Sequence, residues 1–225
     1  MSKTTERIQQ GNFIYMLIGL LMLLVFAPVV SQYFPDNTGL IIQFTFMTIM
    51  FIGVWSLQNN KRWFIIGIVL TMLAILLSVI NFFIQSPNIQ FLSLGLVLIF
   101  CVLSVVLAMQ QILFSGRIST NKLVGSICIY LLLGVIWALL YSFIDRLTVD
   151  AFNGLSAHAN QQVIWEYIYF SFVTLSTLGY GDISPANEIA RSLVYMEAIC
   201  GQIYLAILVA SLVGAHMSEQ ATKNK

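Results

Sequence analysis

One short stretch, STLGYGD at residues 176–182, has the composition of a loop that binds a cation through its backbone. A cation that loses its water inside a membrane needs several oxygen ligands at fixed positions, and consecutive carbonyl groups facing one axis supply them. The hydroxyl of Thr177 can add a further layer of oxygen. Such a backbone alternates between conformations that most residues avoid and glycine tolerates, which suits Gly179 and Gly181 at every second place. We call Ser176–Asp182 the candidate filter.

The composition places this loop in an integral membrane protein. Of 225 residues, 59% are hydrophobic and 8% are charged, and the mean hydropathy is +0.91. Between Ile8 and Gly116 the only charged residues are Asp36, Lys61 and Arg62. Apolar runs of about 20 residues predict helices rather than the alternating strands of a barrel. No basic patch suggests a nucleic-acid partner, so membrane lipids are the expected surroundings.

The apolar runs predict an all-α fold with six membrane-spanning helices and one shorter helix. The shorter run, Val163–Ser176, has roughly 14 residues and cannot cross a ~30 Å hydrocarbon core. We therefore expect it to be a re-entrant pore helix that leads directly into the candidate filter. The six spans are predicted at Asn12–Tyr33, Leu40–Leu57, Trp63–Gln85, Gln90–Phe114, Asn121–Ile144 and Arg191–His216.

The basic residues predict the orientation of these spans. They gather before the first span, after the second, after the fourth and at the chain end, at Lys3, Arg7, Lys61, Arg62, Arg117, Lys122, Lys223 and Lys225. The positive-inside rule then puts both termini in the cytoplasm and opens the candidate filter outward. The turns outside the membrane are expected at residues 35–39 and at Ser86-Pro87-Asn88, and in a loop at Asp145–Gln162. His158 in that loop is either a pH sensor or simply solvated.

The spans divide into two predicted domains, residues 1–116 and residues 117–225. The first has four helices in the position of a voltage sensor, but the Gln90–Phe114 span contains no Arg or Lys. A voltage sensor needs several charges within the membrane field, so steep voltage gating is not expected. Polar residues at membrane depth there suit interhelical hydrogen bonds, or alternatively a lipid or small-molecule site.

The last span carries further candidate residues of the second domain. Glu197 is either a brace, hydrogen-bonded to the back of the pore helix at a residue such as Thr174, or a proton site for gating. Gly201 is a hinge or a close-packing point. Three residues at helical spacing are expected to face a cavity beneath the candidate filter: Gln202, Leu205 and Val209.

Residues 169–182, YFSFVTLSTLGYGD, together with Pro185, Arg191 and the run GQIYLA at 201–206, resemble the two-helix pore module of bacterial potassium channels. The resemblance covers about residues 127–214 and implies a homotetramer in the bacterial cytoplasmic membrane, with Gly201 as the gating glycine. It also implies that K+ binds at Thr177, Leu178, Gly179 and Tyr180, that Gly181 completes the filter, and that Tyr169, Phe170, Thr174, Asp182 and Glu197 support it. The sequence departs from the family at Leu178, where Val is commoner, and at Tyr169-Phe170, where Trp-Trp is frequent.

These observations predict a tetrameric, six-helix, voltage-insensitive potassium channel with no cofactor, in which K+ is the permeant ion. A weakly selective cation channel is an alternative in the same class. A potassium carrier is the alternative from another class, although carriers tend to show inverted repeats and broken helices. No cluster of His, Cys or Asp and no nucleophile–base pair lies at membrane depth, so an enzyme is not expected.

Overall fold

The computed structural model describes residues 12–33, 45, 47–48, 61–84, 86–113, 120–148, 150–155 and 163–223. The predicted span Leu40–Leu57 and His158 lie outside these residues, apart from Thr45, Met47 and Thr48, which are helical. Five helices in the described part are long and apolar enough to cross a membrane. They are α2 (Asn12–Tyr33), α4 (Lys61–Ile84), α5 (Pro87–Leu113), α6 (Thr120–Leu147) and α8 (Glu188–Lys223).

The helix ends agree closely with the sequence prediction, and α2 agrees at both ends. The turn predicted at Ser86-Pro87-Asn88 is wrong, because Pro87 begins α5. Proline suits the first helical position, where no intrahelical partner exists for an N–H group and its fixed φ is already helical. Ser86 precedes the helix, and its carbonyl oxygen accepts a hydrogen bond from the Gln90 amide at 3.2 Å.

Three further boundaries lie outside their predicted positions, and the largest difference is at the end of α8, which continues seven residues beyond His216 to Lys223. Helix α6 continues three residues beyond Ile144, so Asp145 belongs to its last turn rather than to the loop. Helix α8 begins at Glu188, three residues early, because Asn187 caps it: its Oδ1 accepts a hydrogen bond from the Ala190 amide at 2.9 Å. An N-cap side chain of this kind satisfies one of the free amide groups of the first turn.

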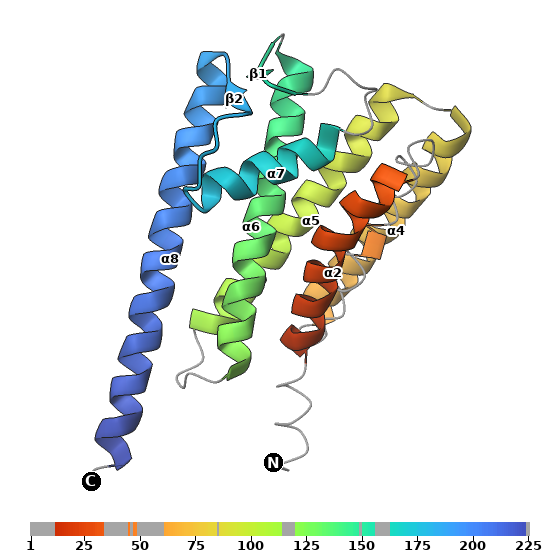
Figure 1. Cartoon of the computed structure of the whole chain (residues 1–225). Coiled ribbons are helices and arrows are strands. Elements are labelled where there is room, and N and C mark those ends of the chain that lie inside the picture. The colour runs from red at the N-terminus through yellow and green to blue at the C-terminus, as the bar shows by residue number, and fades with distance from the viewer. Residues whose placement is uncertain are drawn as a thin grey trace.

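Helix α6 is the centre of the bundle, and it packs against α2, α5, α7 (Val163–Leu175) and α8. Figure 1 shows α7 lying across the long helices, with α8 along one side and α2, α4 and α5 on the other. The described ends of the chain, the start of α2 and the end of α8, lie at the same end of the bundle. The core follows α6, where Leu132, Val135, Ala138, Leu139 and Tyr141 are almost fully buried.

A pair of two-residue strands, β1 (Phe152–Asn153) and β2 (Ser184–Pro185), lies at the opposite end of the bundle, which we call the strand end. The strands pair antiparallel, with Phe152 opposite Pro185 and Asn153 opposite Ser184. The sequence analysis did not predict them, because two-residue strands leave no periodic pattern. They join the loop after α6 to the segment that follows the candidate filter.

Candidate functional site

Helix α7 positions the candidate filter by ending immediately before it. Amide groups of the candidate filter cap the last turn of α7: Thr177 N–H donates to the Thr174 carbonyl at 2.9 Å, and the Leu178 and Gly179 amides donate to the Val173 carbonyl at 3.0 and 3.2 Å. The carboxyl end of a helix carries a partial negative charge. This end of α7 therefore lies next to the start of the candidate filter, where a cation is favoured.

The backbone of the candidate filter alternates in conformation. Thr177, Gly179 and Gly181 have φ values of 60°, 59° and 81°. Positive φ at every second residue is the alternation that the spacing of Gly179 and Gly181 predicts. A Cβ atom at either glycine would meet nothing within 4 Å. The backbone conformation, rather than a lack of space, therefore requires glycine at these two positions.

Thr177 is the member of this pattern that the sequence analysis missed. A β-branched residue at positive φ is an outlier, and such a conformation costs on the order of 1–3 kcal/mol. The Thr177 hydroxyl donates to the Ser176 carbonyl at 2.6 Å. Nothing in the sequence signals this conformation, because threonine does not favour it. Strain of this kind concentrates at functional sites.

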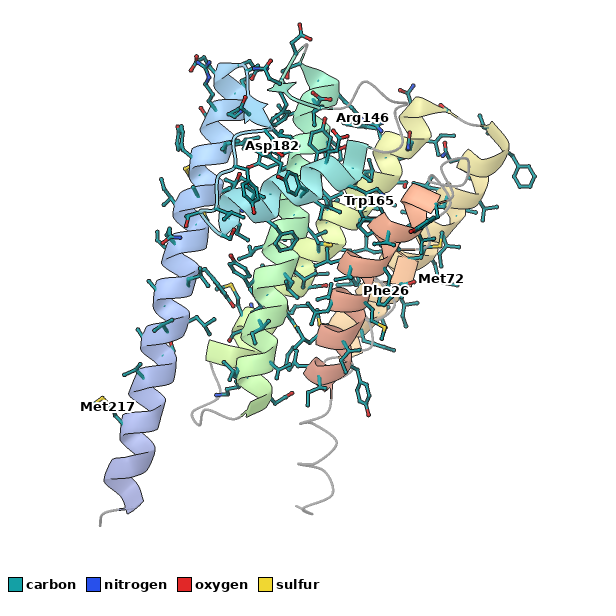
Figure 2. All side chains as sticks on the ribbon, viewed as in Figure 1. Phe26, Met72, Arg146, Trp165, Asp182 and Met217 are labelled. Atoms are coloured by element: carbon teal, nitrogen blue, oxygen red, sulfur yellow. The ribbon has the colours of Figure 1, made fainter. Side chains whose placement is uncertain are left out.

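Asp182 is the last residue of the candidate filter, and a hydrogen bond ties it back to α7. The Tyr169 hydroxyl on α7 donates to Asp182 Oδ2 at 2.7 Å. Figure 2 shows Asp182 between α7 and the two strands. This hydrogen bond lowers the pKa of the Asp182 carboxyl and raises the pKa of Tyr169 to about 12. Two predicted support residues are thereby brought together.

Glu197 is fully buried and joins three helices. The Tyr141 hydroxyl of α6 donates to Glu197 Oε2, and the Ser171 hydroxyl of α7 lies 2.5 Å from Glu197 Oε1. Glu197 therefore bonds to the pore helix as the brace interpretation predicts, but through Ser171 rather than Thr174. Its second partner, Tyr141, lies on α6. The sequence analysis missed both partners, since a lone serine or tyrosine in an apolar helix has no distinctive spacing.

The contacts of Ser171 fit a neutral Glu197. The Ser171 hydroxyl also lies 2.8 Å from the Gly134 carbonyl oxygen, which can only accept. A serine hydroxyl has one proton to donate. Each contact has its own proton when Ser171 donates to Gly134 and the protonated carboxyl of Glu197 donates to Ser171. An ionised carboxylate at membrane depth is also costly.

Two glycines allow the helices around α7 to approach closely. A Cβ atom at Gly201 on α8 would lie 2.6 Å from the Leu175 carbonyl oxygen, at the last residue of α7. A Cβ atom at Gly134 on α6 would lie 2.6 Å from the Phe172 ring. Of the two roles considered for Gly201, this geometry supports the close-packing point. Gly201 follows Glu197 by one turn, so both contacts fasten the same face of α8 to α7.

The remaining candidate residues lie on different sides of the protomer. Phe170 is buried, with its ring centroid 5.2 Å from that of Tyr141 and 5.7 Å from that of Phe152. Leu178 and Tyr180 of the candidate filter are 55% and 67% exposed. On α8, Gln202 and Val209 are exposed and Leu205 is half-buried. Gln202 and Val209 therefore lie on the exposed side of α8, whereas Leu205 follows Gly201 by one turn on the packed side.

Comparison with known proteins finds its match in this same part of the chain. Residues 123–217, from α6 to α8, match the family model described as ion channel. The inward rectifier potassium channel Kirbac3.1 of Paramagnetospirillum magnetotacticum is 42% identical over 50 residues, which are 22% of this chain and 17% of that protein. Two-pore potassium channel 4 of Arabidopsis thaliana is 30% identical over 90 residues, 40% of this chain and 32% of that protein.

These matches support a potassium channel family. The family model and the matched relatives are ion channels, and the five long apolar helices indicate a membrane protein. The matched segments cover at most 32% of the length of these relatives. Helices α2, α4 and α5 lie outside the residues of the family match. Among the residues that the structure describes, no group of three His, Cys, Asp or Glu side chains could hold a metal ion.

Proposed function

We propose that this protein is a potassium-selective channel, in which the candidate filter conducts K+ passively through its backbone carbonyl groups. The observation that carries the proposal is the alternation of positive φ at Thr177, Gly179 and Gly181 directly after α7. K+ sheds water at the mouth, passes between carbonyl groups of Thr177 to Gly181, and regains water in a cavity beneath them. No cofactor is required, because the permeant ion is the only ligand of the pore.

The working unit is a homotetramer. One loop supplies oxygen ligands from one side only, and an ion that has lost its water needs ligands all around. Residues 176–182 are exposed in the single protomer, as is one face of α8, including Tyr195, Ile199 and Ile203. Exposed apolar surface of this kind suits lipid or neighbouring copies. Four copies around one axis would enclose the ion between four candidate filters.

The proposed channel has two domains, residues 1–116 and residues 117–225, with six spanning helices in all. The first domain does not sense voltage, because α5 contains no Arg or Lys. Each elementary charge that crosses the field contributes ~2.3 kcal/mol per 100 mV, and α5 supplies none. The protein lies in the bacterial cytoplasmic membrane with both termini in the cytoplasm. The strand end is then extracellular. Between Asp145 and Ala190 five acidic residues stand against one basic residue, and such an excess at the mouth concentrates cations.

The test is recording from purified full-length protein in planar bilayers. In a gradient of K+ against Na+, we expect the reversal potential to follow the K+ gradient. The open probability should change little between positive and negative voltage. A reversal potential near zero with equal K+ and Na+ on opposite sides contradicts selectivity and leaves a weakly selective cation channel. A steep gating-charge current contradicts the voltage-insensitive first domain.

A further inference from the structure

The loop after α6 fastens the outer end of the candidate filter. At Gly154, φ is 84°, and a Cβ atom there would lie 1.9 Å from the Asp182 carbonyl oxygen. Carbon and carbonyl oxygen normally meet at about 3.3 Å. The backbone at Gly154 therefore lies directly against the backbone of Asp182, at a distance that no other residue type permits.

The strand pair holds this contact in register. Ala186 N–H donates to the Ala151 carbonyl at 2.9 Å, next to the pairing of β1 with β2. In an antiparallel pair, hydrogen-bonded and non-hydrogen-bonded positions alternate. Pro185 therefore occupies a position, opposite Phe152, at which its missing N–H group costs no bond. Beyond it, Asn187 Nδ2 donates to Thr148 Oγ1 at 3.1 Å.

The loop is in turn anchored in the protein core. Phe152 is buried, and its ring centroid lies 5.3 Å from that of Tyr141 and 5.7 Å from that of Tyr167. Tyr141 is also the residue that donates to Glu197. The strand β1 is thus attached to α6 and α7 through aromatic packing, and it presents Gly154 to Asp182 from a fixed position.

We propose that residues 151–154 and 182–187 form an outer clamp, in which Gly154 is a positioning residue for the candidate filter. The proposal rests on the proposed function. Asp182 follows Gly181 directly and is held twice, by Tyr169 at its carboxylate and by Gly154 at its carbonyl group. Binding groups must be held to within about 0.5 Å to function. A methyl group at position 154 displaces Asp182 by more than this tolerance.

The first experiment compares Gly154→Ala with wild type by K+-dependent thermal stabilisation of the full-length protein. A ligand that binds only the folded state stabilises it by an amount that rises with the logarithm of the ligand concentration divided by Kd. We expect the variant to need roughly tenfold more K+ for half-maximal stabilisation, the change that corresponds to about 1.4 kcal/mol. The matched control is Gly95→Ala on α5, whose added Cβ atom would lie 3.6 Å from Phe143, an ordinary contact.

A second substitution separates contact from conformation. Asparagine tolerates positive φ better than alanine, but Gly154→Asn brings the same Cβ atom against Asp182. We expect Gly154→Asn to need as much K+ as Gly154→Ala. If Gly154→Asn behaves like wild type, or if Gly154→Ala behaves like Gly95→Ala, the clamp does not position the candidate filter and the proposal is overturned.

A crosslink tests the clamp even if these variants do not fold. Asn153 and Ser184 are register partners, and hydrogen-bonded partners lie at about 5.5 Å between Cα atoms, a separation that a disulfide bridges. We expect Asn153→Cys with Ser184→Cys to crosslink under added oxidant and to lower the K+ requirement until reduced. Failure to crosslink, or a crosslink without effect on the K+ requirement, overturns the proposal.

The same measurements distinguish the clamp from the proposed function. If K+ and Na+ stabilise the wild-type protein equally, that result contradicts the potassium-selective channel. Crosslink formation then still reports whether the loop lies against the segment after the candidate filter, because it does not depend on the ion.

Discussion

The two parts of this molecule are held together by different forces. Around α6, α7 and α8, buried polar side chains bridge neighbouring helices, as Ser171 and Tyr141 do at Glu197. In α4 the buried hydroxyl of Thr71 bonds within its own helix, to the Gly67 carbonyl at 2.8 Å. Helices α6, α7 and α8 are thus joined by side-chain hydrogen bonds between helices. In α4 and α5, Thr71 bonds within its own helix, whereas the buried Asn81 Oδ1 and Ser104 Oγ have no hydrogen-bond partner among the described residues.

The comparison with known proteins follows the same division. Within the residues that match the ion channel family, the hydrogen bonds of Ser171 and Tyr141 join α6, α7 and α8. Helices α2 and α4 expose large apolar side chains along their length, including Phe26 and Met72, which Figure 2 labels. Ion selectivity depends on where the carbonyl groups of a filter lie. We therefore infer that the hydrogen bonds between helices keep the candidate filter in position.

The largest expected effect comes from the backbone of the candidate filter. Gly179→Ala forces a side chain onto a residue with φ of 59°, a conformation that glycine alone adopts freely. We expect loss of K+ selectivity over Na+ in planar bilayers. Gly95→Ala, in a helix with room for a methyl group, is the matched control. Retained selectivity in Gly179→Ala would mean that the alternating backbone does not bind the ion.

The buried carboxyl gives the next largest effect. Glu197→Ala leaves the Tyr141 hydroxyl without its partner and leaves Ser171 with the Gly134 carbonyl alone. A buried unsatisfied group costs about 1–3 kcal/mol. Glu197→Gln keeps one acceptor and one donor, as the neutral acid does. We therefore expect the glutamine variant to retain most of the thermal stability and the current that the alanine variant loses. Equal losses in both variants contradict the neutral carboxyl.

How far the sequence predicts this structure depends on the kind of signal. Long apolar runs predicted both ends of α2 and, within about three residues, the ends of α4, α5 and α6 and the start of α8, because lipid demands helices. The end of α8 lies seven residues beyond the predicted His216. The glycine spacing predicted positive φ at Gly179 and Gly181. Contacts between single polar residues, such as Ser171 with Glu197, arise from three helices meeting, and no local pattern specifies them. The same is true of position 154, where a side chain is excluded because the Asp182 carbonyl oxygen lies against the backbone.

A smaller effect is expected at the hydrogen bond between Tyr169 and Asp182. The lowered pKa of Asp182 means that its contribution is present above the ordinary carboxyl pKa and is lost as the pH falls through the lowered value. The raised pKa of Tyr169, about 12, means that the bond is lost at the alkaline side only as the pH rises through that value. Between these limits the bond is constant.

The substitution Tyr169→Phe should shift this acid limit. Without the hydroxyl donor, the pKa of Asp182 returns toward its ordinary value of about 3.9. We expect the K+ current of the variant to fall at a higher external pH than that of wild type during acid titration. Tyr33→Phe changes an exposed tyrosine of α2 and serves as the control. Identical acid midpoints in all three proteins contradict a role for this hydrogen bond.

The smallest effect is the difference in stability that we expect between two matched serine-to-alanine substitutions, one in each part of the molecule. Ser171 and Ser78 are both buried serines, one on α7 and one on α4. Ser171→Ala removes a bridge between three helices, so we expect a loss of about 1–3 kcal/mol, the cost of leaving buried groups unpaired. We expect Ser78→Ala to cost less than this, because the side-chain hydrogen bond described in α4, at Thr71, lies within the helix and joins no other helix. Thermal unfolding of both variants in the same detergent measures the difference. Equal losses would show that hydrogen bonds hold α4 as strongly as they hold α7. The two parts would then differ in their similarity to known proteins but not in the forces that hold them.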